Sequence, residues 1–347
     1  MTSEIAAIPL GARTALVTGA AGFIGFFLIR RLLADGFRVV GLDSLNEYYE
    51  VALKERRLLQ LQQSEGFRFV KGKLEDPGIL MGLMAEEKPQ IVINLAAQAG
   101  VRYSIENPRA YVEANLVGVL ELLEAARAYP PEHLLLASTS SAYGATTQMP
   151  YVETMKVDNQ MSFYAATKKA NESMSHAYAH LYDLPVTMFR FFTVYGPWGR
   201  PDMALFKFTK NVLNGQPIDV YNYGDMKRDF TYVEDLIEGI RLLIDAVPVR
   251  PEDGVVPTGD SLSPVAPWRV VNIGNSEPVQ LLDFIRAIEM ATGRTAELNL
   301  MPMQAGDVPA TWADTTLLES LTGYRPRTTV PEGVRKFVDW YRGYYRV

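Results

Sequence analysis

Seven short apolar runs recur along the chain, and segments with helical spacing separate most of them. The runs read TALVT, FRVVGL, FRFV, IVINL, HLLLAS, VTMFRFF and RVVNIG. Because they are rich in Val, Ile and Leu, with little polar alternation, they are typical of strands buried on both faces of a sheet. Their alternation with helices is typical of βαβ units. The sequence therefore predicts an α/β fold with a doubly wound parallel sheet.

The size and charge of the chain narrow the class of ligand. With 347 residues, 48% of them hydrophobic, the chain is long enough for one large α/β domain or two smaller ones. Its formal charge of -6 argues against a general affinity for nucleic acid or for an anionic membrane. An anionic ligand would have to be small and be met by a few local arginines.

Two features bear on the compartment. The chain has no cysteine, which excludes disulfides and thiolate chemistry and fits a reducing environment. The first residues, MTSEIAAIPLGAR, lack the basic region and apolar core of a signal peptide, and no apolar run is long enough to span a bilayer. We therefore expect a cytoplasmic protein with no membrane partner.

The first apolar run leads directly into a glycine-rich turn. Gly19, Gly22 and Gly25 follow it, and Phe23 to Gly36 has the spacing of a helix that ends at a glycine. Such glycines allow a tight turn, a close approach of the backbone to a pyrophosphate, and close packing of the helix, whose N-terminus attracts phosphates. We therefore expect a dinucleotide site in a Rossmann-type domain.

Asp43 ends the second run, about 20 residues after the glycines, where dinucleotide-binding chains carry an acidic residue. A carboxylate there would accept hydrogen bonds from the adenosine ribose and repel a 2′-phosphate. No arginine stands beside it in the sequence. The pattern predicts NAD rather than NADP.

Tyr164 and Lys168 lie four residues apart in a segment with helical spacing, so their side chains share one face. A lysine ammonium near a phenol stabilises the phenolate and lowers the pKa of a tyrosine from about 10 towards the working pH. Such a tyrosine would take the proton of a sugar hydroxyl while a hydride passes from the same carbon to NAD. The pair therefore predicts a redox site after the fifth apolar run.

The spacing Gly-x-x-Gly-x-x-Gly, together with Tyr164-Ala-Ala-Thr-Lys168, resembles the extended short-chain dehydrogenase/reductase family that acts on nucleotide sugars. The resemblance covers nearly the whole chain. It implies that Lys168 also bonds the nicotinamide ribose and that the strand end NLAAQAG lines the cofactor. The cofactor-binding residues that it implies are Gly19, Gly22, Phe23, Ile24, Gly25, Asp43, Leu74, Leu95, Ala96, Ala97, Gln98, Asn115, Tyr164, Lys168 and Phe191.

One position departs from this family. Many members have Gly-Asp-Leu at the end of the third strand, with the Asp against adenine, whereas this chain reads Gly72-Lys73-Leu74. Glu75 or Asp76 is expected to replace that contact.

The stretch STSSAYG, Ser138 to Gly144, follows the fifth run. By resemblance, Thr139 is the third catalytic residue and shares the O4 proton of the sugar with Tyr164; alternatively, it only satisfies a turn. In nucleotide-sugar 4,6-dehydratases Asp and Glu follow this Thr, and in UDP-glucuronate decarboxylases a Glu follows two places on. This chain has Ser140 and Ser141 there, which favours plain epimerisation at C4.

The stretch FRFFTVYGPWGRPDMALF, with LAAQAGVRYS, YAATKKANE and GDMKRDFTY, resembles the UDP-glucuronate 4-epimerases. That resemblance implies that hydroxyl side chains lie near the sugar carboxylate and that an arginine lies near the sugar. It also implies arginine and aspartate contacts to the diphosphate and uridine, and a tyrosine stacked on uracil; for each arginine, exposure on the surface is the alternative. The implied substrate-binding residues are Arg102, Ser140, Ser141, Thr193, Arg200, Tyr221, Arg228 and Asp307.

The expected reaction interconverts UDP-glucuronate and UDP-galacturonate by oxidation at C4 with NAD, rotation of the keto sugar and reduction on its other face. A UDP-glucuronate decarboxylase and a neutral UDP-sugar 4-epimerase of the galactose type are the alternatives, and a non-catalytic NAD-sensing protein is the least expected. By resemblance, the protein forms a homodimer through the helices around Asn115 and Tyr164. No metal is expected, because His176 and His180 share a helix face without a third ligand.

The regular alternation weakens after Arg190, where Pro, Gly and aromatic residues become frequent. We predict an NAD-binding Rossmann domain from residues 1–190, 225–245 and 268–276, and a smaller α/β nucleotide-sugar-binding domain from 191–224, 246–267 and 277–347. Val247 to Trp268 has five prolines and no regular period, so it should be a surface excursion. The segments VQLLDFIRAIEMATG and VPEGVRKFVDWYRGYY have amphipathic helical spacing.

Overall fold

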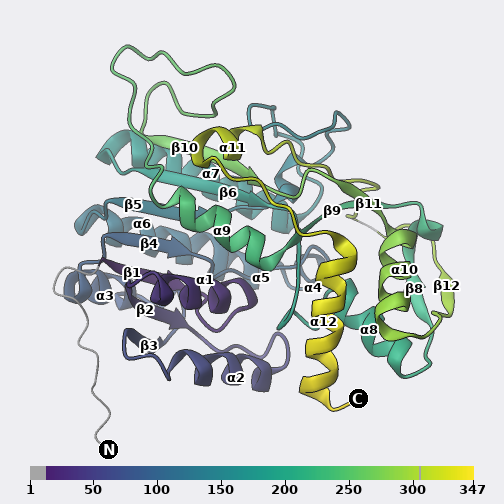
Figure 1. Cartoon of the computed structure of the whole chain (residues 1–347). Coiled ribbons are helices and arrows are strands. Elements are labelled where there is room, and N and C mark those ends of the chain that lie inside the picture. Colours follow the sequence, from purple (N-terminus) through teal and green to yellow (C-terminus); the bar gives the residue numbers. More distant parts are fainter. Residues whose placement is uncertain (1–12, 305) are drawn as a thin grey trace, which may run out of the picture.

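Seven parallel strands form the main sheet of the computed structural model, which describes residues 13–304 and 306–347 (Figure 1). Their order is β10-β6-β5-β4-β1-β2-β3, and each corresponds to one of the seven apolar runs, so the predicted doubly wound sheet is confirmed. Residues 1–12, on which the prediction of no signal peptide depends, lie outside the described residues. The strands are β1 (Thr14–Thr18), β2 (Arg38–Asp43), β3 (Phe67–Lys71), β4 (Ile91–Asn94), β5 (His133–Ala137), β6 (Val186–Phe191) and β10 (Trp268–Ile273).

Helices cover both faces of this sheet (Figure 1). One face carries α1 (Phe23–Ala34), α2 (Val51–Leu61), α9 (Val233–Leu243) and α11 (Thr316–Thr322). The other carries α3 (Ile79–Glu87), α6 (Gly118–Ala128) and α7 (Phe163–Tyr182). Short helical segments lie near the strand ends: α4 (Tyr103–Glu106), α5 (Pro108–Tyr111), the π-helix η1 (Val112–Val117) and the 3-10 helix η2 (Ser140–Tyr143).

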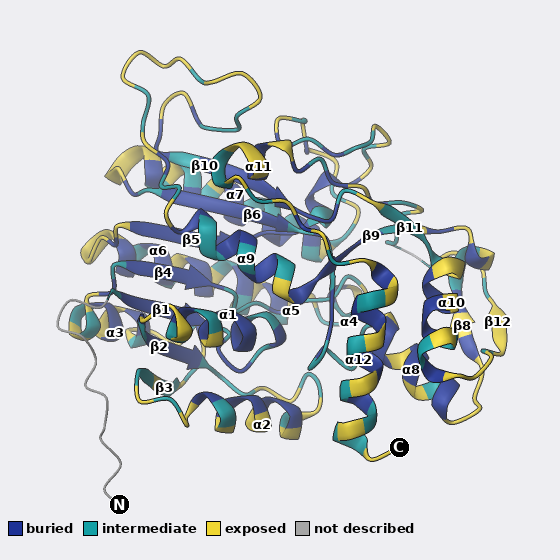
Figure 2. Ribbon diagram, in the orientation of Figure 1, coloured by how far each residue is buried: buried dark blue, intermediate teal, exposed yellow. Residues whose placement is uncertain are grey.

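The first βαβ unit shows how the sequence produces this layering. In β1, Ala15 and Val17 pack towards α1, whereas Leu16 packs towards α3 and α6. Both sides of the strand are therefore apolar, as the run TALVT predicts, and Figure 2 shows the central strands as buried. Helix α1 ends at Ala34, and Gly36 has a φ of +84°, so it is the helix C-terminal glycine that was predicted.

A second set of elements follows β6. Strands β7, β9 and β11 form a three-stranded sheet, β8 pairs with β12, and α10 packs against α12 and α8. These elements are β7 (Thr193–Tyr195), α8 (Ala204–Leu213), β8 (Ile218–Val220), the 3-10 helix η3 (Tyr221–Gly224), β9 (Lys227–Tyr232), β11 (Pro278–Gln280), α10 (Leu281–Thr292), β12 (Leu298–Leu300) and α12 (Val330–Tyr345). Helices α10 and α12 confirm the two predicted amphipathic segments. None of the helices in residues 13–304 and 306–347 combines the length and the apolarity needed to cross a bilayer.

The proline-rich excursion has neither helix nor strand up to residue 267, and Trp268 already begins β10. Its contacts go to the large sheet and its helices: Ser263 hydrogen-bonds His176 of α7 at 2.8 Å, and Arg250 pairs with Asp183. We therefore propose that residues 246–267 belong with the large sheet and not, as predicted, with the smaller unit. The rest of the predicted domain division stays a prediction.

Candidate active site

A cavity of about 440 Å³ opens at the carboxyl ends of β1, β4 and β5. In open parallel sheets ligands bind at this edge, where the strand order reverses. The sequence-predicted residues that line it are Gly19, Gly22, Phe23, Ile24, Gly25, Asp43, Leu74, Leu95, Ala96, Ala97, Gln98, Thr139, Tyr164, Lys168, Phe191 and Arg200.

The glycine-rich turn forms one wall. Gly19 has a φ of +72°, and a Cβ added there would lie 2.9 Å from the backbone nitrogen of Ala96. A Cβ on Gly25 would lie 2.1 Å from the carbonyl oxygen of Gly19. No side chain fits at either position, so the turn, the first turn of α1 and the end of β4 pack backbone against backbone.

The N-terminus of α1 faces the cavity through Gly22 to Gly25. Gly22 is the N-cap and has no side chain, so the N–H groups of the first turn have no side-chain partner at the cap. Backbone donors of this kind, together with the helix dipole, attract an anionic group. This wall therefore fits the pyrophosphate of a dinucleotide.

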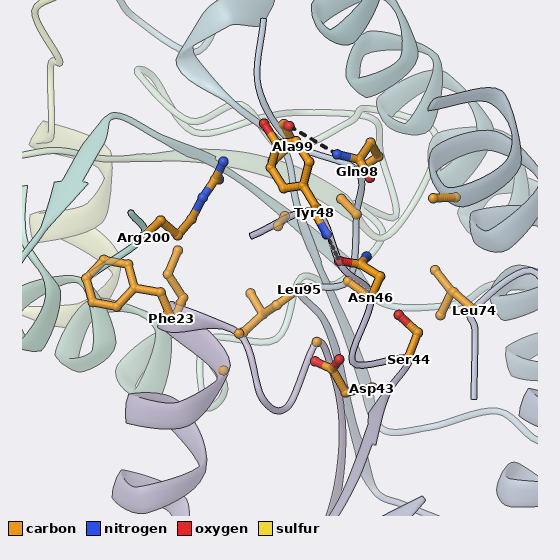
Figure 3. Close-up of a pocket in the computed structure, with 18 of the residues that line it drawn as sticks. Phe23, Asp43, Ser44, Asn46, Tyr48, Leu74, Leu95, Gln98, Ala99 and Arg200 are labelled. Atoms are coloured by element: carbon orange, nitrogen blue, oxygen red, sulfur yellow. Dashed lines mark hydrogen bonds between the residues drawn. The ribbon is translucent and has the colours of Figure 1, made fainter. Parts of the chain in front are cut away.

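Asp43 is fixed at the end of β2 by two backbone donors. Its Oδ2 accepts from Ala21 N at 3.0 Å and its Oδ1 from Leu45 N at 2.8 Å. Figure 3 shows Asp43 at the edge of the cavity, near Ser44. Lys54, which sequence reasoning missed, also lines this end and is buried; its Nζ donates to the backbone oxygen of Asn46 at 2.5 Å. Burial lowers the pKa of Lys54 to about 8, although the charge of Asp43 opposes that shift. The carboxylate that predicts NAD therefore has a cation near it in space.

The two carboxylates expected to replace the missing Asp beside adenine lie in different places. Lys73, Leu74 and Glu75 line the cavity, whereas Asp76 turns back and accepts from Lys73 N at 2.9 Å. Of the two carboxylates proposed to replace the missing Asp, Glu75 is the one that lines the cavity.

Asn115 was predicted to bind the cofactor, but its side chain lies behind the cavity wall. It is buried in η1, where its Oδ1 accepts from Gln98 N at 2.8 Å and its Nδ2 donates to Gln98 O at 3.1 Å. Nδ2 also donates to Thr167 Oγ1 at 3.0 Å. Both amide protons are therefore used inside the protein, and Asn115 holds the strand end that carries Gln98.

Thr139, Tyr164 and Lys168 come together from the end of β5 and from α7. Lys168 Nζ donates to the carbonyl oxygen of Ala137 at 2.9 Å. Thr139 Oγ1 accepts from Ser141 N at 3.2 Å and so caps η2. Thr139 therefore satisfies a turn and also faces the cavity, where its hydroxyl can donate to the Tyr164 phenol or to a ligand.

The pKa of Tyr164 is shifted upwards, whereas a nearby charged lysine would shift it downwards. Its phenol lies deep in the cavity, and burial raises its pKa above the ordinary value; the Thr139 hydroxyl and the charge of Arg200 oppose this only in part. Burial also lowers the pKa of Lys168 to about 8. Thr139 and Arg200, and not Lys168, are the groups that lower the pKa of Tyr164, and the Lys168 ammonium donates to Ala137 instead.

A smaller cavity, of about 50 Å³, adjoins the same segment. Ser140, Ser141 and Asp307 line it together. Arg228 Nη2 donates to Asp307 Oδ1 at 2.7 Å, and this arginine is mostly buried, so a solvated surface position is excluded for it. Four predicted substrate residues, from distant parts of the chain, thus lie in one place.

The other predicted substrate residues are more scattered. Arg200, in the main cavity, pairs with Asp202 at 2.6 Å, and its guanidinium points towards the ring of Tyr48 (Figure 3). The Arg102 guanidinium lies 5.0 Å from the ring centre of Tyr221. Thr193, in β7, lines neither cavity, although its neighbours on both sides line the main one.

Several lining residues were missed because they lie in loops without a motif. The loop after β2 contributes Ser44, Asn46, Tyr48 and Tyr49. The paired tyrosines of NEYYE, right after a strand that ends in an acidic residue, were the available signal. The remaining missed residues are Leu42, Gly72, Lys73, Ala99, Ala110, Glu113, Ala114, Ala137, Ser138, Phe192, Val194 and Met203.

Residues 15–256 match the model of the family described as "NAD dependent epimerase/dehydratase family". A probable UDP-glucuronate 4-epimerase of Rhizobium meliloti (strain 1021) is 54% identical over 333 residues, which cover 95% of this chain and 97% of that protein. UDP-glucuronate 4-epimerase 4 of Arabidopsis thaliana is 43% identical over 96% of this chain and 76% of its own length.

Solved structures of 4-epimerases are also similar to this chain. The UDP-glucuronic acid 4-epimerase of Bacillus cereus, in complex with UDP-glucuronic acid and NAD, has a TM-score of 0.85 and 30% identity, covering 96% of this chain and all of that one. The UDP-glucose 4-epimerase of Thermus thermophilus, in complex with NAD, has a TM-score of 0.81 and 30% identity, covering 95% of this chain and 99% of that one.

Proposed function

The chain belongs to the NAD dependent epimerase/dehydratase family, and on that premise we propose that it is an enzyme that interconverts UDP-glucuronate and UDP-galacturonate with NAD. The observation that carries the sugar assignment is its likeness to UDP-glucuronate 4-epimerases along almost the whole chain, both in sequence and in structure. Ser140 and Ser141 support it, since a dehydratase or a decarboxylase of this family would carry a carboxylate in this segment.

The residues around the main cavity fit the cofactor. The uncapped first turn of α1 and the glycine turn would hold the pyrophosphate, and Asp43 would hold the adenosine ribose. When bound, NAD supplies a hydride acceptor and a positive charge on its nicotinamide ring.

Tyr164 would remove the proton from the sugar O4, and Thr139 would donate a hydrogen bond to the same oxygen. The raised pKa keeps Tyr164 protonated in the cavity. Because only the phenolate can accept the O4 proton, nearby positive charge must stabilise the phenolate when the reaction occurs. Lys168, whose pKa of about 8 leaves it mostly charged at neutral pH, is the protein's own source of that charge. After the keto sugar turns over, the phenol returns its proton to O4.

The hydroxyl-rich segment would meet the sugar carboxylate. Ser140 and Ser141 line the small cavity beside Asp307 and Arg228, which would face the nucleotide. Hydroxyls bond a carboxylate without a fixed countercharge, so they would let the ring rotate between the two hydride transfers. Arg200 would bind the diphosphate after exchanging its bond to Asp202.

The test is to incubate the purified protein with UDP-glucuronate and to follow the anomeric signals by NMR. We expect UDP-galacturonate to accumulate to an equilibrium mixture. Absence of UDP-galacturonate would exclude the function; release of UDP-xylose or a 4-keto pentose would identify a decarboxylase instead. Faster turnover of UDP-glucose than of UDP-glucuronate would identify a neutral-sugar epimerase.

We also propose that the enzyme is a homodimer. Large apolar side chains are exposed along η1, α6 and α7, the elements that carry Asn115 and Tyr164. Helix α6 packs beside α7, so two copies of this pair would form a four-helix interface. The exposed residues are Val112, Val117, Leu120, Phe163, Leu181 and Tyr182.

A further inference from the structure

One carboxylate outside the cavity is buried where α7 crosses the ends of β5 and β6. Glu172 is 1% exposed and accepts from three neighbours. Ser138 Oγ donates to its Oε1 at 2.7 Å, and Arg190 donates from Nε to Oε1 and from Nη2 to Oε2, each at 2.9 Å. Lys169 Nζ donates to Oε2 at 3.2 Å. Both oxygens of this carboxylate are therefore bonded twice.

The position of Glu172 along α7 connects it to the reacting groups. It lies one helical turn after Lys168 and two turns after Tyr164, so the three share one helix face. Lys168 bonds the carbonyl of Ala137, and Glu172 bonds the side chain of Ser138, the next residue. The helix is thus attached to the end of β5 at two successive turns, directly before Thr139.

Arg190 extends the same network to the far side of Thr139. Its guanidinium lies 4.6 Å from the ring centre of Tyr143, at the end of η2, and the Tyr143 hydroxyl donates to Asn272 Oδ1 at 2.7 Å. The segment that contains Thr139 is therefore held before and after that residue. Glu172 links the two attachments, because it bonds both Ser138 and Arg190.

A buried ion pair of this kind adds little net stability, because desolvation of the two charges offsets most of their attraction. Burial alone would raise the pKa of Glu172, but the charges and hydrogen bonds of Arg190, Lys169 and Ser138 together outweigh it, and the pKa is lowered. Glu172 is therefore ionised at neutral pH and bonds its neighbours as a carboxylate.

We propose that Glu172 is a positioning residue for the proton transfer: through Ser138 and Arg190 it fixes the Thr139 hydroxyl relative to the Tyr164 phenol. This inference rests on the proposed epimerase function. A displacement of about 1 Å between reacting groups lowers a rate by about 100-fold without removing any of them. Loss of the Glu172 carboxylate should therefore affect the chemical step and leave ligand binding nearly unchanged.

The first experiment compares Glu172→Gln with the wild-type enzyme, both as full chains with NAD bound. We expect kcat for UDP-glucuronate to fall about 10- to 100-fold, with KM and bound NAD unchanged. We also expect a larger kinetic isotope effect with substrate deuterated at C4, because hydride transfer becomes rate-limiting. Asp260→Asn is the matched control, because it alters another buried carboxylate that accepts two bonds from one arginine, Arg269, at 2.8 and 2.9 Å; it lines neither cavity and should keep wild-type kinetics.

Ser138 provides a second variant that keeps the ion pair and so avoids an unpaired buried arginine. Ser138→Ala should show the same fall in kcat and rise in isotope effect, and Ser138→Thr, which restores the hydroxyl, should recover most of the rate. An unchanged kcat and isotope effect in Ser138→Ala, or a loss of rate that only follows loss of thermal stability, would overturn the positioning role. A wild-type protein with no epimerase activity would instead refute the proposed function.

Discussion

Thr139 shows how one side chain serves two neighbours at the end of a strand. Its oxygen accepts a backbone N–H and closes η2, while its proton can be donated to the Tyr164 phenol or to a ligand in the cavity. A hydroxyl can do this because it is both donor and acceptor. A carboxylate at the same place could cap the turn but could not donate.

Tyr164→Phe removes the proposed acid and base while keeping the ring that packs against Tyr111. We expect kcat to fall by about 100- to 10,000-fold, the range that a single general acid or base contributes, with NAD still bound. Steady-state kinetics and the ultraviolet spectrum of the purified protein measure the two quantities. Turnover at the wild-type rate would refute the role given to this phenol.

Gly25→Ala places a methyl group where a Cβ would lie 2.1 Å from the Gly19 carbonyl oxygen. The backbone of the turn must move, so we expect a large loss of bound NAD together with a lower melting temperature. Gly82→Ala is the matched control: it lies in α3, where an added Cβ has open space, and should be neutral or stabilise by up to about 1 kcal/mol. Equal NAD content in both variants would show that the tight turn is not required.

At the scale of elements, the sequence identified the seven central strands because a strand buried on both faces leaves a continuous apolar run. It did not identify β7, β8, β11 and β12, which have three residues each and are too short to show a period. The predicted residues of the main cavity belong to motifs at the ends of strands. Lys54 was missed because α2 brings it back near Asp43 in space. Only the structure shows which way the Asn115 amide points.

His133 ties β5 to two neighbouring elements and should make stability depend on pH. It is fully buried; its ring nitrogens contact Ile244 O and Thr187 Oγ1, and burial lowers its pKa to about 4. Above pH 6.5 the residue is neutral in both folded and unfolded chains. As pH falls from 6.5 towards 4, only the unfolded chain takes up the proton, so the folded state loses stability.

Urea unfolding at pH 7 and pH 5 tests this. His133 should lower the free energy of unfolding by about 2 kcal/mol from pH 7 to pH 5. His133→Gln should be less stable at pH 7 but should not show this pH-dependent loss. The comparison with the variant is needed because burial raises the pKa of Glu153 to about 7 and that of Asp229 to about 6, which act in the opposite direction. Equal pH dependence in both proteins would contradict the assignment.

At the scale of the whole molecule, the site depends on parts far apart in the sequence. Ser140 and Ser141 follow β5, whereas Arg228 and Asp307 come from β9 and from the segment before α11. Asp229, next to Arg228, accepts from the backbone of Asn275 and Ala313 and so holds these segments together. Such contacts join residues that no local pattern connects, which is why resemblance, and not periodicity, was needed to predict them.

The same elements that hold the site also present the proposed dimer surface, and this relation can be tested. Leu120, on α6, is 42% exposed, and a charge there would face the partner copy in a four-helix interface. We expect light scattering to give about twice 38.7 kDa for the wild-type chain and a single-chain mass for Leu120→Glu. Met290→Glu, on α10 and 81% exposed, should remain dimeric. A monomeric wild type would exclude the dimer, and a dimeric Leu120→Glu would move the interface to another face.

Since α7 carries Tyr164 and packs beside α6, loss of the dimer should also lower kcat.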